Sequence, residues 1–511
     1  MTRRAPSPNR AAQCTSKAMP DPRATSLTPW QWILLSIVLV LLWCLAISEM
    51  TGSEITKDAA DNLQLALNVA HHGVMSLDTA PPYRPSMMRE PVPVGVIAAA
   101  VYVTDKLEGP AAPDSYFSGT RARQLKLTNL FWLTLLSVCA FLAVRRFTSM
   151  FSFALLAVVL VGLDFTRLVP LSIRQFIGVN NLCTDLAGAA VLTSASLLVV
   201  IGAARRSKAT LLAAGACFGL AALTKASLFY VCIALLAAFA AYPLFRVWRR
   251  TTALQPVAGL AGAFAAAFFL VAFSWMYRNH VQTGYWQIAE RAGSVLLYRA
   301  YIDEMTPQET LGAIVVWSEP HLGRVLSRYT GFTSADLQPG GRLQRLSERF
   351  SGEEQERELS AENSGRPQDA LSWYRKGRAV YEAHLAECVR EGYSYPSAEA
   401  DLRTRNEAVH LIAQTPVKHA ALMPLLMWRG APVTFAILVA TFAYAWRRGR
   451  LDVLMFVSAA GALAVFYSAV SHFTPRYGYT IHAVGVVALL TLAAAAVPRR
   501  SALTRPLSSL Q

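Results

Sequence analysis

Charged residues are scarce in this chain, and acidic ones are scarcer still. Only 16% of its 511 residues are charged, against roughly 25% in soluble domains. Hydrophobic residues make up 54% and gather in runs of about 20, the length that an α-helix needs to cross a hydrocarbon core of about 30 Å. A buried core helix of a soluble protein explains one such run but not the whole series. The composition therefore predicts a polytopic membrane protein.

Several signatures of well-known sites are absent from the sequence. It has no Walker loop, no dinucleotide-binding fingerprint, no Cys/His metal cluster and no internal repeat. Cysteines are few, and four of the seven fall inside apolar runs, where we interpret them as small packing residues: Cys44, Cys139, Cys217 and Cys232. Cys183 and Cys388 are both expected on the extracytoplasmic side, and whether they form a disulfide is left open.

Basic residues exceed acidic ones by a formal net charge of +16, but they do not form a patch that would fit a nucleic-acid groove. They stand in short clusters beside apolar runs: Arg145-Arg146, Arg205-Arg206 with Lys208, Arg246 with Arg249-Arg250, Arg447-Arg448 with Arg450, and Arg499-Arg500. Such clusters are typical of the cytoplasmic ends of membrane helices. The pattern predicts the orientation of each helix and argues against nucleic acid as a partner.

Ten crossings bring every Arg cluster to the cytoplasmic side. The predicted spans are 30–48 (a signal-anchor), 127–144, 150–166, 184–203, a hairpin within 209–245 that turns near Lys225, 254–276, 431–446, 451–470 and 479–497. As one helix, the run 209–245 would reach about 55 Å, which is too long for a single crossing. The segment 91–104 begins with Pro91 and Pro93 and is too short to span, so we expect an interfacial or re-entrant helix there.

The expected fold class is an all-α polytopic membrane protein with interfacial helices in the first outer loop and a mainly helical outer loop domain. The predicted divisions are a disordered cytoplasmic tail at 1–29, an N-terminal transmembrane module at 30–277 with its first outer loop at 49–125, a large extracytoplasmic loop at 278–428, C-terminal transmembrane helices at 429–498 and a cytoplasmic tail at 499–511. Apolar spacing around Trp373–Glu387 indicates amphipathic helices in the large loop. We expect this loop to cap the outer face.

The segment 58–74 divides into two faces on a helical wheel. The apolar face holds Ala59, Leu63, Ala66, Leu67, Ala70 and Val74, and the polar face holds Asp58, Asp61, Asn62, Asn68 and His72. We therefore expect an amphipathic helix that lies on the membrane with its carboxylates turned outward. A merely solvated polar face is the plainer alternative.

Ionisable groups in or near the membrane are costly, which makes them functional candidates. The threading gathers one such set at the outer face: Asp58, Asp61, His72, Arg89, Glu90, Arg167, Arg174, Asp185, Lys225, Arg278, His280, His472 and Arg476, with Trp275, Asn279 and Tyr477 beside them. A single cation at a helix end often only reaches toward lipid headgroups. Lys225, Arg278 and Arg476 together, on the side where positive charge is disfavoured, indicate an anionic ligand such as a lipid phosphate.

Six short segments, in order along the chain, resemble the GT-C superfamily of polyprenyl-phosphate-sugar-dependent glycosyltransferases, in particular bacterial relatives of protein O-mannosyltransferases and of lipid A aminoarabinose transferases. They are Lys57-Asp58-Ala59-Ala60-Asp61 through His72-Gly73, Arg89-Glu90-Pro91, Thr184-Asp185-Leu186, Leu223-Thr224-Lys225, Ser274-Trp275 with Arg278-Asn279, and Pro475-Arg476-Tyr477. The resemblance covers about residues 30–300 and 430–497, and each motif alone is weak. Many members carry Asp-Glu at the first site, whereas Ala59 follows Asp58 here.

The resemblance implies transfer of a sugar, with inversion, from a polyprenyl monophosphate to an acceptor outside the cytoplasm. It also implies a bacterial inner-membrane enzyme, and the charge pattern puts both termini in the cytoplasm. A carboxylate would act as the base toward the acceptor, and cations would stabilise the leaving phosphate. We expect Asp58 as the base with Asp61 as the alternative, Asp185 as the residue that positions acceptor or metal, and Arg89, Lys225, Arg278, His472, Arg476 and Tyr477 at the donor phosphate. A divalent metal at Asp58, Asp61, His72 and Asp185 stays open.

A second function class also fits the pattern: a membrane protein that binds or translocates a polyprenyl-linked glycan without transferring its sugar. A transporter favours broken helices at the midplane and inverted repeats, and the sequence indicates neither. Among transferases, the sequence does not distinguish a protein, lipid A, lipopolysaccharide core or cell-wall glycan acceptor.

Overall fold

The computed structural model describes residues 27–168, 177–248, 255–290, 292–348 and 350–497. Every regular element within these ranges is a helix, so the predicted all-α fold is confirmed. The predicted tail at 499–511, most of the tail at 1–29 and the residues Arg174, Arg249 and Arg250 lie outside the described residues.

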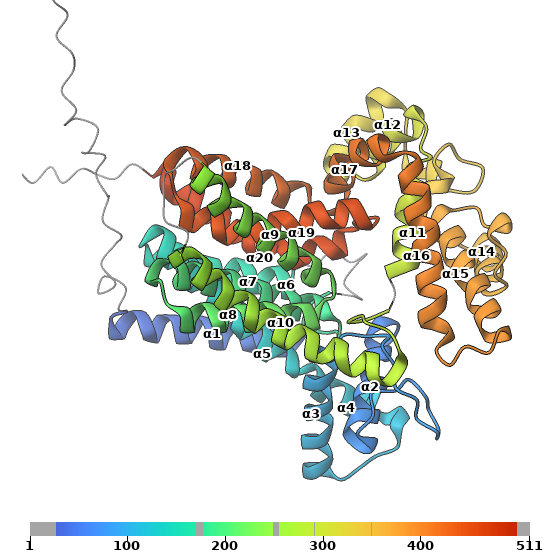
Figure 1. Ribbon diagram of the computed structural model, residues 1–511, viewed down its shortest axis with the longest axis horizontal. Coiled ribbons are helices and arrows are strands. Elements are labelled where there is room, and N and C mark those ends of the chain that lie inside the picture. The colour runs from blue at the N-terminus through green and yellow to red at the C-terminus, as the bar shows by residue number, and fades with distance from the viewer. Residues whose placement is uncertain (1–26, 169–176, 249–254, 291, 349, 498–511) are drawn as a thin grey trace, which may run out of the picture.

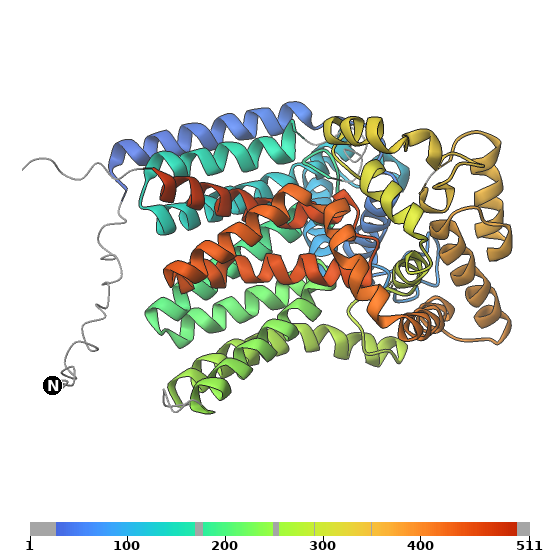
Figure 2. The ribbon, with the colours of Figure 1, turned by 90° about the horizontal axis from the view of Figure 1, so that it is seen from above.

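A bundle of helices running broadly alongside one another makes up most of the molecule (Figures 1 and 2). Its members are α1 (Pro29–Glu49), α5 (Thr128–Thr148), α6 (Phe151–Thr166), α7 (Thr184–Arg205), α8 (Lys208–Thr224), α9 (Ser227–Trp248), α10 (Gln255–Thr283), α18 (Pro432–Arg448), α19 (Leu451–Val470) and α20 (Pro475–Ala496). Each predicted span coincides with one of these helices. The run 209–245 divides into α8 and α9 at Lys225, where the hairpin was predicted.

Length and apolarity mark six helices within the described ranges as candidate membrane spans: Pro29–Glu49, Gly119–Thr148, Thr184–Arg205, Ala258–Thr283, Leu451–Val470 and Pro475–Ala496. A seventh candidate is the pair Pro416–Gly430 and Pro432–Arg448, which is bent by 112°. Three further apolar helices are shorter: Phe151–Thr166, Lys208–Thr224 and Ser227–Ala238. These helices support a multi-pass membrane protein, while the number of ten crossings stays a prediction.

Small residues let the bundle helices approach closely. In α7, 78% of the most apolar window is buried, and Gly, Ala, Ser and Thr supply much of its surface. At Gly215 of α8, an added Cβ would lie only 2.1 Å from the carbonyl oxygen of Phe264 in α10. Membrane helices pack through such small residues because their backbones can then touch. This packing holds the C-terminal end of α8, and with it Lys225, in position.

The segment predicted as the first outer loop folds into three α-helices, α2 (Asp58–His72), α3 (Pro91–Glu108) and α4 (Gly119–Lys126), and α3 runs crosswise to the bundle at one of its ends (Figure 1). The apolar face of α2 packs against α3 through residues such as Leu63 and Ile97. The helix ends at Gly73, whose φ of 69° belongs to the left-handed region that glycine adopts readily. α3 is not among the candidate spans, in line with the interfacial helix expected at 91–104.

The polar face of α2 is less solvated than the helical wheel predicts. Asn62 and Asn68 are buried. Asn62 Nδ2 donates to the carbonyl oxygen of Leu182 at 2.8 Å, and Asn68 Nδ2 donates to that of Ser76 at 2.6 Å. The alternative of a merely solvated polar face therefore does not hold for these two amides. A helical wheel contains no information about loops that fold back onto the helix, and these loops supply carbonyls that need donors.

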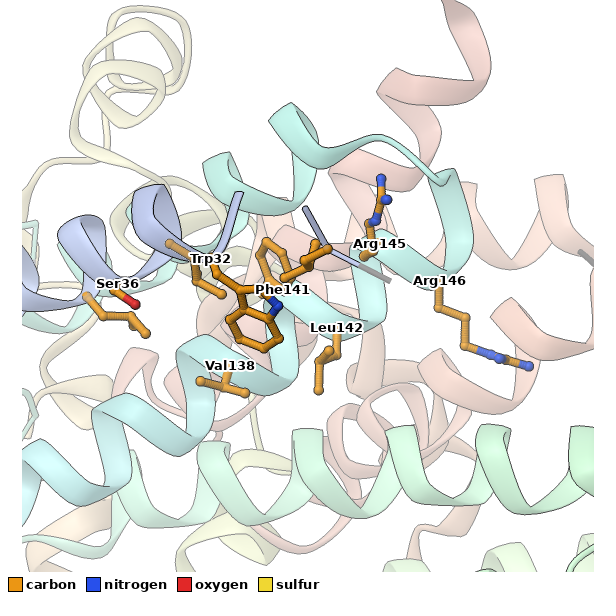
Figure 3. Close-up of a pocket in the computed structure, with 10 residues that line it drawn as sticks. Trp32, Ser36, Val138, Phe141, Leu142, Arg145 and Arg146 are labelled. Carbon is orange, nitrogen blue, oxygen red and sulfur yellow. The ribbon is translucent and has the colours of Figure 1, made fainter. Parts of the chain in front are cut away.

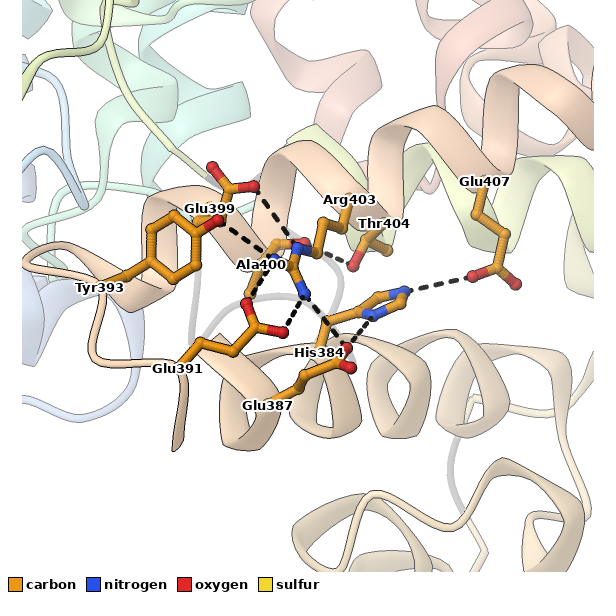
Figure 4. Close-up of polar contacts among 9 residues, drawn as sticks. All are labelled: His384, Glu387, Glu391, Tyr393, Glu399, Ala400, Arg403, Thr404 and Glu407. Atoms are coloured by element: carbon orange, nitrogen blue, oxygen red, sulfur yellow. Dashed lines mark hydrogen bonds and ion pairs between the residues drawn. The ribbon is translucent and has the colours of Figure 1, made fainter. Parts of the chain in front are cut away.

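The large outer loop forms a mainly helical cap at the bundle end that also carries α2–α4 (Figure 1). Its helices are α11 (Ala292–Ile302), α12 (Pro307–Val316), α13 (Pro320–Thr330), α14 (Glu353–Asn363), α15 (Trp373–Arg390), α16 (Pro396–Gln414) and α17 (Pro416–Gly430). Arg403 of α16 joins α15 by donating to Glu391 at 2.6 Å and to Glu387 at 3.1 Å (Figure 4). The amphipathic helix predicted around Trp373–Glu387 is thus present as α15.

A buried arginine fastens the cap to the bundle. Arg299 of α11 is fully buried and pairs with Asp303 at 2.6 Å. Its guanidinium also donates to the carbonyl oxygens of Ser468 at 2.9 Å and His419 at 2.7 Å. Since Ser468 belongs to α19 and His419 to α17, one side chain ties three helices together beside the candidate site.

Candidate active site

Six charged side chains meet where the first outer loop contacts the bundle. We name Asp58, Asp61, Arg89, Asp185, Lys225 and Arg476 the carboxylate–cation cluster. Arg89 Nη2 donates to Asp58 Oδ1 and to Asp61 Oδ2, both at 2.6 Å. Arg476 donates to Asp58 Oδ2 at 2.7 Å and to Asp185 Oδ2 at 3.0 Å. Lys225 Nζ lies 2.7 Å from Asp185 Oδ1, so an unbroken chain of ion pairs runs from Asp61 to Lys225.

Helix ends position the members of this cluster. Asp58 and Asp61 lie in the first turn of α2 and Asp185 in the first turn of α7, where the helix dipole favours negative charge. Lys225 caps the C-terminal end of α8, and Arg476 follows Pro475 in the first turn of α20. These ends meet on one side of the bundle, which is why residues 418 positions apart can pair.

The cluster is buried at Asp185 and accessible to solvent at Asp58 and Asp61. Asp185 is only 1% exposed, whereas the side chains of Asp58 and Asp61 are 24% and 36% exposed. A buried carboxylate requires cationic partners, and Asp185 has two. Burial lowers the pKa of Arg89, but the charges and hydrogen bonds of Asp58 and Asp61 outweigh burial, so its pKa ends above the ordinary value. A ligand would therefore reach the cluster from the side of Asp61.

Two tyrosines flank Lys225 and extend the site beyond its charges. Lys225 Nζ lies 5.7 Å from the ring centroid of Tyr467 and 5.6 Å from that of Tyr477, and the two rings are stacked. Lys225 also donates to Thr480 Oγ1 at 2.8 Å. Sequence analysis missed Tyr467 and Thr480 because they lie inside apolar runs. The spacing of Thr480, one helical turn after Arg476, is the signal that could have found it.

Glu90 ties the segment before α3 to the break between α8 and α9. Its Oε1 accepts a hydrogen bond from the backbone N–H of Ala226 at 3.0 Å. Arg89 and Lys225, the neighbours of these two residues, both belong to the carboxylate–cation cluster. The Arg-Glu-Pro and Thr-Lys motifs are therefore in direct contact.

Two predicted site residues are not joined to the cluster. Arg278 donates to Asn279 Oδ1 at 2.9 Å, and its guanidinium lies 4.7 Å from the ring centroid of Trp275. His72 is exposed and stacks on Tyr83, with ring centroids 4.2 Å apart. A role of either residue at the donor remains a prediction.

His472 lies buried beside the cluster rather than within it. Its ring centroid is 5.6 Å from that of Tyr477. Burial lowers the pKa of His472 to about 4, although the carboxylate of Glu348 lies 3.5 Å away. The imidazole is therefore neutral at pH 7, and it could meet a phosphate by hydrogen bonding but not as a cation. Arg429 donates to Glu348 at 2.5 Å and to the carbonyl oxygen of His472 at 3.0 Å. The sequence analysis did not single out Glu348 or Arg429.

The carboxylates considered above as possible metal ligands are paired with cationic side chains. No group of three or more His, Cys, Asp or Glu side chains that could hold a metal ion occurs in the described part of the chain. Asp58 and Asp61 share Arg89, and Asp185 is held by Lys225 and Arg476. These residues do not fit a resident metal. Cys183 and Cys388 are both buried free thiols.

No protein-family model matches the chain, and no curated protein matches it. Among solved structures, it is similar to the archaeal oligosaccharyltransferase AglB from Archaeoglobus fulgidus, solved with an inhibitory peptide and a dolichol-phosphate, with 13% identity and a TM-score of 0.45. That likeness covers 91% of this chain and 51% of AglB, so the chain spans about half of AglB's length. It is also similar to ArnT from Cupriavidus metallidurans in the apo state, with 15% identity, a TM-score of 0.28, and 90% and 77% of the two chains covered.

Both similar structures are GT-C glycosyltransferases, the superfamily that the sequence motifs resemble. Neither TM-score reaches 0.5, so these two likenesses carry no argument about the superfamily or the activity of this chain.

Proposed function

We propose that this chain is a membrane glycosyltransferase that moves a sugar from a polyprenyl-phosphate donor to an acceptor outside the cytoplasm, with inversion. One observation carries the proposal. Charged residues from five separate motifs belong to a single network of ion pairs: Asp58, Arg89, Asp185, Lys225 and Arg476. The motifs were selected by type and order along the chain, without any knowledge of contacts. Their convergence supports a common site.

The cluster has the chemistry that such a transfer requires. A carboxylate takes the proton of the acceptor hydroxyl, whose oxygen attacks the anomeric carbon. The bond between that carbon and the phosphate oxygen breaks, and the polyprenyl phosphate leaves with the electron pair. Arg476 and Lys225 would stabilise the charge that develops on it, because positioned cations act strongly at a partly buried site.

Asp58 is the better candidate for the base. It pairs directly with Arg476, which also contacts Asp185, whereas Asp61 pairs with Arg89. A base must lie near the carbon that carries the phosphate, and the phosphate would lie against Arg476. An entering phosphate would compete with Asp58 for this guanidinium, which would make the carboxylate more basic.

Transfer assays test this function. Membranes that contain the chain are incubated with radiolabelled polyprenyl-phosphate sugars, and the label is followed from the lipid fraction into protein, lipid or glycan. We expect the label to leave at least one donor, and to stay on it with the Asp58→Asn variant at equal abundance. Tight donor binding without any transfer, unchanged by Asp58→Asn, would favour a protein that binds or translocates the glycan.

A further inference from the structure

A second candidate site lies at the bundle end opposite the carboxylate–cation cluster. A groove of about 510 Å³ opens there between α1 and α5. Its walls are mostly apolar, with Trp32 and Leu35 on one side and Val138 and Phe141 on the other. Arg145 and Arg146 lie on one side of the lining residues and Ser36 on the other (Figure 3). The volume falls in the range of about 300–1,000 Å³ that is usual for small-ligand sites.

The two arginines of the groove have hydrogen-bonding capacity that the protein does not use. Arg145 Nη1 donates to the carbonyl oxygen of Ser149 at 2.6 Å. The Nε atoms of both Arg145 and Arg146 are buried and have no hydrogen-bond partner. At the adjoining turn, Asp452 pairs with Arg450, with both N–O distances at 2.9 Å, and its charge also interacts with that of Arg146. The Nε atoms are enclosed by protein, so an anion in the groove would bind through the terminal nitrogens of the two guanidinium groups, to which several oxygens can accept hydrogen bonds.

The other wall of the groove is poorly covered by protein. Only 17% of the apolar window of α1 is buried, and Trp32 is 57% exposed. A second hollow of about 450 Å³ runs along α1 and shares Trp32 and Ser36 with the groove. Tryptophan and arginine at one level are typical of the membrane–water interface. The groove and this open face of α1 therefore meet at one tryptophan, and the groove is lined at one end by Arg145 and Arg146.

We propose that this groove binds an anionic glycerophospholipid. The headgroup phosphate accepts hydrogen bonds from Arg145 and Arg146, and the two acyl chains lie along the groove and along the open face of α1, on either side of Trp32. Charge decides the class of lipid, because a zwitterionic headgroup would bring its own cation toward the guanidinium groups. The bound lipid fills the space between α1 and α5. The bound lipid thus stabilises the position of α1, the helix that precedes the loop carrying Asp58.

Native mass spectrometry of the full chain in detergent tests the proposal. Phosphatidylglycerol and phosphatidylcholine with identical acyl chains are titrated separately, and the first bound lipid is quantified. We expect phosphatidylglycerol to bind about tenfold more tightly. The double variant Arg145→Gln, Arg146→Gln should lose this preference. Trp32→Ala should weaken both lipids and keep the preference, which separates the wall of the groove from its charges.

The matched control is Arg447→Gln, Arg448→Gln, which removes the same charge from an exposed turn that does not line the groove. It should keep the tenfold preference. Equal loss in both double variants would mean that general surface charge attracts the lipid, and the proposal would fail. An unchanged preference in the groove variant would also overturn it. So would a dimer that forms without bound lipid and dissociates on Trp32→Ala, because a second copy of the chain would then occupy the groove.

Discussion

Asp58 and Asp61 are only one helical turn apart, yet their surroundings differ. Asp58 pairs with two arginines, one of which also holds Asp185, whereas Asp61 pairs with Arg89 and is the more exposed of the two. A base needs both a fixed position and contact with the acceptor. Asp58 is thus the more firmly positioned carboxylate and Asp61 the more accessible one, so substitution of each residue is needed to identify the base.

The variant Asp58→Asn should keep its abundance and donor binding but lose at least about 10²-fold in transfer rate, because the amide cannot accept the acceptor proton. Asp61→Asn is the paired control and should retain most of the activity. The measurement is sugar transfer per mole of purified protein. If only Asp61→Asn is inactive, the base is Asp61. If both variants are fully active, the catalytic base lies outside the first outer loop.

Arg476→Lys tests phosphate recognition. Lysine keeps the charge but cannot reproduce the forked contact with Asp58 and Asp185. We expect affinity for a polyprenyl-phosphate analogue to fall by about tenfold or more in detergent. Arg278→Lys tests the predicted role of Arg278 at the donor phosphate, because this residue lies outside the carboxylate–cation cluster; a change of less than about twofold would exclude that role. An equal loss in both variants would extend the phosphate site to α10.

Among the helices, the contact between α8 and α10 has a direct consequence for the site. Gly215 and Gly219 of α8 lie against α10, and at Gly215 an added Cβ would meet backbone atoms of Phe264. Backbone cannot move aside as a flexible side chain can, so a methyl group would push the helices apart. Because Lys225 directly follows α8, a shift of this helix would also disturb the pairing with Asp185.

Gly215→Ala should destabilise the protein by about 1–3 kcal/mol, as overpacking does in other cores. Thermal unfolding in detergent measures this effect, together with the affinity for the donor analogue. Gly262→Ala on α10 is the matched control, because an added Cβ there has nothing within 4 Å. It should be neutral or stabilising, since alanine is the better helix former. Equal stability of the two variants would contradict close packing at Gly215.

At the scale of the whole molecule, pairs of arginines lie at one end of the bundle and the carboxylate–cation cluster lies at the other. Arg145-Arg146, Arg205-Arg206 and Arg447-Arg448 lie at the C-terminal ends of helices α5, α7 and α18, away from Asp185 and Lys225. Arg450 at the α18–α19 turn donates to the carbonyl oxygen of Phe147 at 3.3 Å, which joins two of these turns. The carboxylate–cation cluster and the cap share the other end. The folded chain thus agrees with the sidedness expected from positive charge.

Reporter fusions test this orientation. Fusions after Arg146, Arg206 and Arg450 should report the cytoplasm, and fusions near Gly119, Ser351 and Thr474 should report the outside, because basic clusters are retained on the cytoplasmic side. A cytoplasmic signal at Gly119 would mean that α3 crosses the membrane. The residues of the carboxylate–cation cluster would then not all face the same side of the membrane, and the proposed transfer outside the cytoplasm would be contradicted.

Local pattern alone determined much of this protein. Apolar runs located the bundle helices because membrane helices satisfy their own backbone hydrogen bonds and have to be apolar along their length. The break at Lys225 followed from helix length. The motifs also identified the charged residues of the cluster, because ionisable groups are rare beside apolar runs and stand out.

Only the tertiary structure decided which of these residues touch. It separated Arg278 and His72 from the cluster, buried Asn62 and Asn68, and added Tyr467, Thr480, Glu348 and Arg429 around it. The physical reason is that pairing between distant segments depends on how helices cross and how loops return, and neither leaves a periodic trace in the sequence. A threonine inside an apolar helix becomes a hydrogen-bond partner of Lys225 only when α20 packs against α7.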